Sequence, residues 1–187
     1  EFVADDYRVM VLPQCEALGN AEVAAVRRFV EQGGTVIADI RPALYDGHLK
    51  LRDGGGALDD LFGVRHTANV PPETATGVVR GAIGSTHVEV DLPNLLVNPA
   101  VTLTRGKALG HAGATPICII HETGRGRAVL LNFPINAFPN LSVADTAEAG
   151  AEFLAALFAE AGVQWPLRLQ DETGKRARDV EAVRWKT

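Results

Sequence analysis

Two continuous apolar runs with an amphipathic segment between them open the chain. Residues 7–12 are almost wholly apolar and are closed by Pro13, and residues 35–40 form a second such run. Runs of this kind are typical of strands that are buried on both faces of a parallel sheet. Between them, apolar residues recur at three- and four-residue spacing, which is typical of a helix. Residues 7–40 therefore predict a β-α-β unit with a right-handed crossover.

The ends of this helix carry residues that cap helices. Asn20 has a side chain suited to the N-cap position. Gly33-Gly34 follows the last apolar position and allows the left-handed conformation that often ends a helix. A second, short helix is predicted over residues 57–62, where Gly63 stops it. The polar, glycine-rich residues 41–56 are then a long loop at the carboxyl end of a strand.

The middle of the chain has a less regular pattern. Residues 65–115 carry short alternating stretches separated by Pro and Gly, which predict small, partly antiparallel strands. After them, residues 117–121 and 128–133 are apolar and flank the turn-like residues 123–127. This arrangement predicts a β-hairpin, and both of its strands are apolar enough to join the main sheet.

A last helix is predicted before Gly162. Ser142 and Asp145 have the spacing of a capping box, and apolar residues recur on one face from Gly150 to Ala161. This face predicts packing against one side of the sheet. Beyond Pro166 the chain alternates in the manner of strands around a turn, like the first hairpin of a following β domain.

Together these elements predict an α/β fold. We expect a doubly wound, flavodoxin-like sheet that is mostly parallel and has helices on both faces. The 187 residues suit one such domain with a short appendage. The predicted boundaries are residues 1–165 for the α/β domain and residues 166–187 for the beginning of a small β domain.

Composition narrows the class of protein. Hydrophobic residues make up 47% and charged residues 22%, which is the balance of a soluble globular chain. The net charge of −5 and the lack of a long basic run give no electrostatic footprint for nucleic acid. No apolar stretch approaches the roughly 20 residues that span a bilayer. Cys15 and Cys118 lie far apart and predict reduced, buried thiols.

The start of the chain bears on where the protein is located. It opens at Glu1 without an initiator Met or a signal peptide, as an excised piece of a longer protein would. With two unpaired cysteines, we expect a cytoplasmic protein that contacts neither nucleic acid nor membrane.

Chemistry in a doubly wound sheet is expected in the loops that follow its strands, here after Leu12, Ile40 and Phe133. Acyl transfer in such folds needs a nucleophile on a tight, glycine-flanked turn. After Ile40 the chain continues Arg41-Pro42-Ala43, which offers no nucleophile, and Pro42 has no N–H for an oxyanion hole. Amidotransferase chemistry is therefore not expected there.

Other candidate chemistry is sparse. Cys15 is the one thiol near a strand end, but a reactive thiol needs a lowered pKa, so a structural role is favoured and a reactive one is the alternative. The five His residues lack metal-ligand spacing. Pairs such as Asp59-Asp60 do not supply the separated carboxylates of a glycosidase. We predict no catalytic residue, no metal and no cofactor.

The densest polar cluster follows the second strand. It consists of Asp39, Arg41, Tyr45, Asp46 and His48. Arg, Tyr and His serve both in protein interfaces and in contacts with sugars. The sequence leaves open whether this loop is an interface or ligand site or an ordinary solvated loop.

Four stretches form a pattern that is shared with a known family. They are residues 7–13 with 29–39, Arg41 with Tyr45-Asp46, residues 58–64 and residues 124–133. In these stretches the chain resembles the glutamine-amidotransferase-like trimerisation domain of family 42-type β-galactosidases. The resemblance implies a class I glutamine-amidotransferase-like fold without catalytic residues. It also implies a homotrimer that frames the active site of an upstream TIM barrel, through which alone a galactoside would bind.

Three functions are compatible with these observations. The expected one is a non-catalytic oligomerisation domain of a β-galactosidase-like glycoside hydrolase, so that this chain is not itself an enzyme. The second is an enzyme of the amidotransferase superfamily that uses Cys15. The third is a carbohydrate-binding accessory module that uses the loop from Arg41 to His48.

Overall fold

The computed structural model describes residues 7–67, 69–135, 147–163 and 172. In chain order its elements are β1 (Val9–Leu12), α1 (Asn20–Glu31), β2 (Thr35–Ala38), α2 (Asp59–Phe62), β3 (Val64–His66), β4 (Glu73–Ile83), β5 (Thr86–Val97), β6 (Val101–Leu103), β7 (Lys107–Ala112), β8 (Thr115–Thr123), β9 (Gly126–Leu131) and α4 (Ala147–Glu160). Among the described residues, no helix combines the length and apolar character that crossing a bilayer requires.

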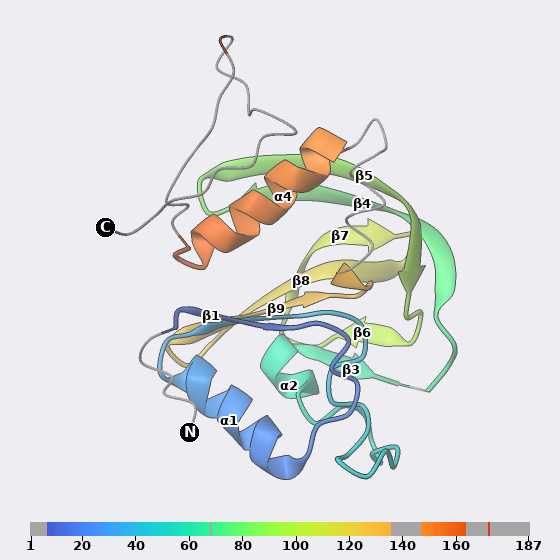
Figure 1. Ribbon diagram of the computed structural model, residues 1–187. Helices are drawn as coiled ribbons and strands as arrows, with labels where there is room; N and C mark the ends of the chain where they lie inside the picture. The colour runs from blue at the N-terminus through green and yellow to red at the C-terminus, as the bar shows by residue number, and fades with distance from the viewer. Residues whose placement is uncertain (1–6, 68, 136–146, 164–171, 173–187) are drawn as a thin grey trace.

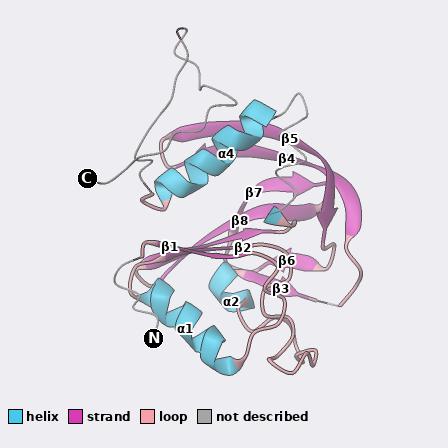
Figure 2. Ribbon diagram, viewed as in Figure 1, coloured by secondary structure: helices cyan, strands magenta, loops and turns pink. Residues whose placement is uncertain are grey.

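Seven strands form one curled sheet, in the order β1-β2-β9-β8-β7-β4-β5 (Figure 1). β1, β2 and β9 are parallel to one another. From β9 to β5, each strand is antiparallel to its neighbour. β3 and β6 pair separately as a small antiparallel sheet. Strands dominate the described chain, as Figure 2 shows, and the long strands β4 and β5 arch over α4.

The predicted fold class is therefore wrong: the sheet is mixed and curled like a half-barrel, and it is not the mostly parallel sheet of a flavodoxin-like α/β fold. The connections explain the difference. Gly84 with Ser85 joins β4 to β5, and Gly124 with Arg125 joins β8 to β9. Turns of two residues can join only antiparallel neighbours, because a parallel pair needs a crossover of a dozen residues or more.

The predicted β-α-β unit at the start of the chain is confirmed. β1 pairs with β2 in parallel, with Val9 opposite Thr35. Helix α1 connects them, and it begins at Asn20 with Gly19 as the N-cap, one residue earlier than predicted. It ends as predicted, because Gly33 has a φ of 107°, a value that glycine adopts without a Cβ penalty.

The region 65–115 differs most from expectation. Small strands were predicted, but β4 and β5 are 11 and 12 residues long and form a continuous ribbon with the main sheet. The predicted hairpin of β8 and β9 is confirmed, with Thr123 opposite Gly126. The predicted short helix ending at Gly63 is also present as α2.

The sheet has an apolar core on each face. On one face, Phe153 and Leu157 of α4 pack with Leu92 of β5 and Val129 of β9. On the other, Phe29 of α1 and Phe62 of α2 pack with a second set of sheet residues. The apolar face predicted for the last helix is confirmed in this way.

Two predictions lie outside the described residues. One is the capping box of Ser142 and Asp145, and the other is the β segment of residues 166–187.

Candidate functional site

Two loops lie side by side at the carboxyl ends of β1 and β2. They comprise residues 13–19 and 39–58, and we call them the loop pair. The backbone N–H of Ala43 donates to the carbonyl of Cys15 at 2.9 Å, and that of Tyr45 donates to the carbonyl of Glu16 at 2.8 Å. These bonds tie the two loops into one unit at the sheet edge where ligands bind in many α/β proteins.

Backbone strain is concentrated in the loop pair. Within the described chain, the non-glycine residues with positive φ are Gln14, Arg41, Ala43, Leu49 and Asn94. All but Asn94 belong to the loop pair. Such conformations cost of order 1–3 kcal/mol each and persist only where the surrounding structure imposes them, as it often does at functional sites.

Asp39 joins the ends of three strands. It is 1% exposed, and its Oδ1 accepts the N–H of Gln14 at 2.5 Å, after β1. Its Oδ2 accepts the N–H of Ile135 at 2.9 Å, after β9. Burial raises the pKa of Asp39, and the two N–H donors oppose that rise. Both oxygens are thus used to fix the loops, and neither is directed at a substrate.

Arg41 is held by a partner that the sequence did not reveal. Its Nη2 donates to Oε1 of Glu16 at 2.9 Å, and its side chain is only 17% exposed. Nε of Arg41 is buried without a partner among the described residues. The pair thus links the two loops across a positive-φ turn.

Tyr45, Asp46 and His48 shape the outer part of the loop. Tyr45 bridges Ala17 on one side and Leu51 on the other, and its hydroxyl accepts from the amide of Asn69 at 3.0 Å. Asp46 accepts the N–H groups of Lys50 and His48, which lowers its pKa. The imidazole of His48 is exposed. The loop is therefore a rigid turn.

Cys15 has the environment of an inert thiol. Its Sγ lies 3.5 Å from the carbonyl oxygen of Pro13. Burial raises its pKa, and the carboxylate of Asp39 raises it further. A nucleophilic thiol needs the opposite shift, because only the thiolate attacks. Cys118 is fully buried, which raises its pKa to about 12.

A buried pair supports the inner end of the loop. The carboxylate of Asp59 accepts the backbone N–H of His66 at 2.8 Å and contacts Nδ1 of the same residue at 2.6 Å. Asp59 therefore has a structural role in the loop, which the sequence analysis did not predict. Gly55 and Gly56 wrap closely around this carboxylate, because a Cβ on either one would lie 2.6 Å from its oxygens.

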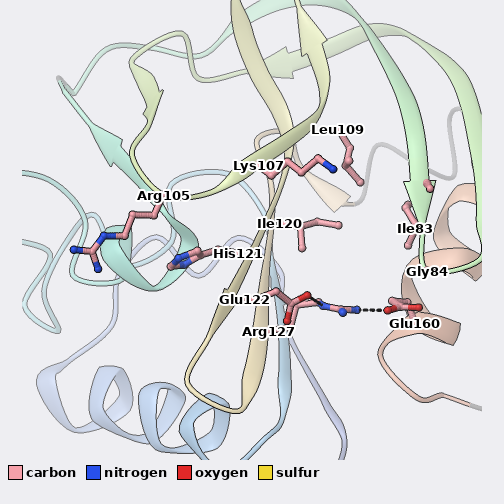
Figure 3. Close-up of a pocket in the computed structure, with 11 residues that line it drawn as sticks. Ile83, Gly84, Arg105, Lys107, Leu109, Ile120, His121, Glu122, Arg127 and Glu160 are labelled. Carbon is pink, nitrogen blue, oxygen red and sulfur yellow. Dashed lines mark hydrogen bonds and ion pairs between the residues drawn. The ribbon is translucent and has the colours of Figure 1, made fainter.

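A groove of about 450 Å³ lies at the opposite end of the sheet (Figure 3). Arg127 sits between Glu122 and Glu160, at 2.6 and 2.8 Å, and joins β9 to α4. Lys107 extends beside Leu109 on the far wall. Both carboxylates thus contact one guanidinium, which links β9 to α4. This arrangement differs from the two carboxyl groups of a glycosidase, which flank a scissile bond.

The described residues hold no group of three or more metal-ligating side chains. Sequence reasoning located Arg41, Tyr45 and Asp46 in one polar loop, and the structure places them together there. It missed Glu16 and Asn69, which contact Arg41 and Tyr45 from 25 and 24 residues away in sequence. No local pattern signals such pairs, because they form only when the strands assemble.

The family model described as β-galactosidase trimerisation domain matches residues 4–164. No curated protein matches.

The fold of the chain is similar to that of domains in solved structures of glycoside hydrolases. A β-galactosidase from Bacillus circulans sp. alkalophilus aligns with a TM-score of 0.67 and 21% identity, over 89% of this chain and 24% of its own. A β-galactosidase from Rahnella sp. R3 aligns at 0.63 and 16%, over 84% and 23%. An exo-β-1,4-mannosidase from Opitutaceae bacterium strain TAV5 aligns at 0.54 and 16%, over 82% and 26%. The chain thus spans about a quarter of the length of these enzymes.

Proposed function

Because this chain belongs to the family of β-galactosidase trimerisation domains, we propose that it is the non-catalytic self-association domain of a longer glycoside hydrolase. Three copies associate, and hydrolysis of a galactoside takes place in another part of the parent protein. The parent is a cytoplasmic enzyme, a location supported by the free thiols Cys15 and Cys118. This chain contacts the substrate only through that catalytic part.

The observation that carries the proposal is the tip of the loop pair. Leu49 is 75% exposed and is held at a φ of 63°, and Leu51 nearby is 40% exposed. The turn made by Asp46 fixes this tip, since Leu49 donates its N–H to the carbonyl of Asp46 at 3.0 Å. A rigid, preorganised apolar side chain makes a good interface anchor, because little entropy is lost when it is covered.

The arrangement of carboxylates supports the non-catalytic part of the proposal. A glycosidase needs two carboxyl groups free to face one scissile bond. In the described chain, the buried Asp39 and the partly buried Asp59 have both carboxylate oxygens engaged by main-chain N–H groups or by the ring of His66. These contacts fix the loops, so a second active site in this domain is unnecessary to explain the two residues.

The test is the mass of the 187-residue chain in solution. Sedimentation equilibrium should give a trimer of about 60 kDa, three times the 19.9 kDa of one chain. A hydrolysis assay with a chromogenic β-galactoside should give no turnover by this chain alone. A 19.9 kDa monomer at all concentrations would contradict self-association, and turnover that survives purification to homogeneity would contradict the non-catalytic role.

A further inference from the structure

A second hollow lies between the loop pair and the region of β3, and residues 51–55 of the loop pair form one of its sides. Its volume is about 470 Å³, which falls in the range of small-molecule sites. The side chains that line it include Leu44, Leu51, Arg52, Asp53, Arg65, Thr67 and Asn69. The glycines Gly54 and Gly55 complete the wall.

The lining combines donors, acceptors and apolar surface. The guanidinium groups of Arg52 and Arg65 can only donate, whereas the carboxylate of Asp53 can only accept. Thr67 and Asn69 can do both. A hydroxyl group also donates one hydrogen bond and accepts others, so a ligand rich in hydroxyls matches such a mixture.

Two of the polar groups are held in position before any ligand binds. Nη2 of Arg52 donates to the carbonyl of Leu18 at 2.8 Å and to Oδ1 of Asn20 at 3.2 Å. The amide nitrogen of Asn69 donates to the hydroxyl of Tyr45 at 3.0 Å, which assigns its orientation. Oδ1 of Asn69 has no partner among the described residues and is available to a ligand. Such preorganisation lowers the entropic cost of binding.

The glycine wall leaves the backbone accessible. A Cβ built on Gly54 would meet nothing within 4 Å, so the main chain there borders open space. Gly54 and Gly55 have φ values of 83° and 118°, which other residues rarely adopt. A ligand can therefore approach the main chain of the loop closely.

We propose that this hollow binds a neutral saccharide. Its hydroxyls would pair with Asp53, Asn69 and the arginines, and its C–H face would pack on Leu44 and Leu51. The lining carries charges of both signs, and a neutral ligand that donates and accepts can pair with each of them, whereas a carboxylate would offer Asp53 no donor. The hollow shares Leu51 with the exposed tip proposed above for self-association, whereas Leu49 belongs to the tip and does not line the hollow.

The experiment is a calorimetric titration of the 187-residue chain. The neutral probes are galactose and lactose, and the anionic probe is galacturonate. Neutral sugars should bind, and D53N and N69A should each weaken that binding about tenfold, a loss of roughly 1.4 kcal/mol, since N69A removes one polar partner and D53N replaces one acceptor oxygen with a donor. D91N, at an exposed aspartate of β5 far from the hollow, should bind like the wild type.

Three results would overturn the proposal: no binding of either neutral sugar, binding that D53N and N69A leave unchanged, or tighter binding of galacturonate. Circular dichroism of each variant establishes that it is folded. The titration is repeated in the L49D variant, which is designed to prevent self-association, so that failure of the saccharide site and failure of the trimer are separate results.

Discussion

The loop pair and the groove beside α4 both gather charged side chains, but they hold their carboxylates largely by different means. The loop pair has one side-chain ion pair, Arg41 with Glu16, whereas its aspartates Asp39 and Asp46 accept backbone N–H groups. In the groove, Arg127 is balanced by the side chains of Glu122 and Glu160. Main-chain bonds fix the path of a loop, whereas a side-chain ion pair fixes only the approach of one element to another.

Strain separates the two regions in the same way. The loop pair holds four ordinary residues, Gln14, Arg41, Ala43 and Leu49, at positive φ besides its glycines Gly54 and Gly55, whereas the groove places only a glycine, Gly84, at a positive φ of 58° among its described residues. A strained turn made of ordinary residues presents side chains where a glycine turn presents none. The loop pair is therefore suited to present side chains in a fixed arrangement, whereas the ion pairs of the groove hold α4 against the sheet.

Of the variants considered, the largest loss of stability is expected when Asp39 of the loop pair is replaced. The D39A variant leaves the N–H groups of Gln14 and Ile135, which make part-buried hydrogen bonds, without their acceptor, and each lost partner costs about 1–3 kcal/mol. We expect the free energy of unfolding to fall by about 3 kcal/mol in total. Urea denaturation at one fixed protein concentration measures it. D91A, at an exposed position, should stay within about 0.5 kcal/mol of the wild type, and an equal loss in both variants would refute the role of Asp39.

Removing the ion pairs of the groove should lower the free energy of unfolding by less than D39A does. In R127Q, Glu122 and Glu160 lose their shared guanidinium, and we expect a loss of about 1 kcal/mol, because the pair is only partly screened from water. R80Q removes the more exposed pair with Glu89 and should cost less than about 0.5 kcal/mol. If R127Q costs as much as D39A, side-chain pairing in the groove is as important as main-chain fixation in the loop pair.

Relief of backbone strain in the loop pair should raise stability, whereas the two preceding variants lower it. Asn adopts the left-handed conformation more readily than Leu, so L49N should raise the free energy of unfolding of the isolated subunit by about 0.5 kcal/mol. It should weaken self-association at the same time, because the apolar anchor is lost. Thermal unfolding at low protein concentration tests the first effect. A destabilised L49N subunit would mean that the φ of Leu49 carries no strain.

The smallest expected effect is a pH dependence of opposite sign at two aspartates of the loop pair. The pKa of Asp39 is raised above its ordinary value of 3.8, so its stabilising contribution is complete below that value and is lost as pH rises through the folded pKa. The pKa of Asp46 is lowered, so its contribution is present above 3.8 and is lost as pH falls through the folded pKa.

Unfolding of D39N and D46N between mildly acidic and neutral pH measures this contrast against the wild type. The difference between wild type and D39N should shrink as pH rises, and the difference for D46N should grow. Differences that run in the same direction would contradict the two environments described for these carboxylates.

The sequence predicted local structure better than the way strands assemble. Residues 7–40 specify their β-α-β unit because an apolar run, a capped helix and a second run follow one another directly. The hairpin of residues 117–121 and 128–133 was predicted as well, but the sheet around it was expected to be mostly parallel, and β8 is antiparallel to β7 as well as to β9. Burial on both faces makes such a strand continuously apolar whatever its direction, so its apolar run cannot reveal that direction.

The candidate site was predicted in part for the same reason. Arg41, Tyr45 and Asp46 lie close in sequence, and their polar density indicated a special loop. The three-strand role of Asp39 depends on Ile135, 96 residues away, and the saccharide hollow depends on β3 lying against the loop. Contacts over such separations appear only in the folded chain.

The central claim is that the tip of the loop pair anchors self-association. Sedimentation equilibrium of the wild type, L49D and L103D tests it most directly, because Leu103 is also an exposed leucine but lies on β6, outside the loop pair. The account predicts trimers for the wild type and L103D and a 19.9 kDa monomer for L49D. A trimer of L49D as stable as that of L103D would contradict it.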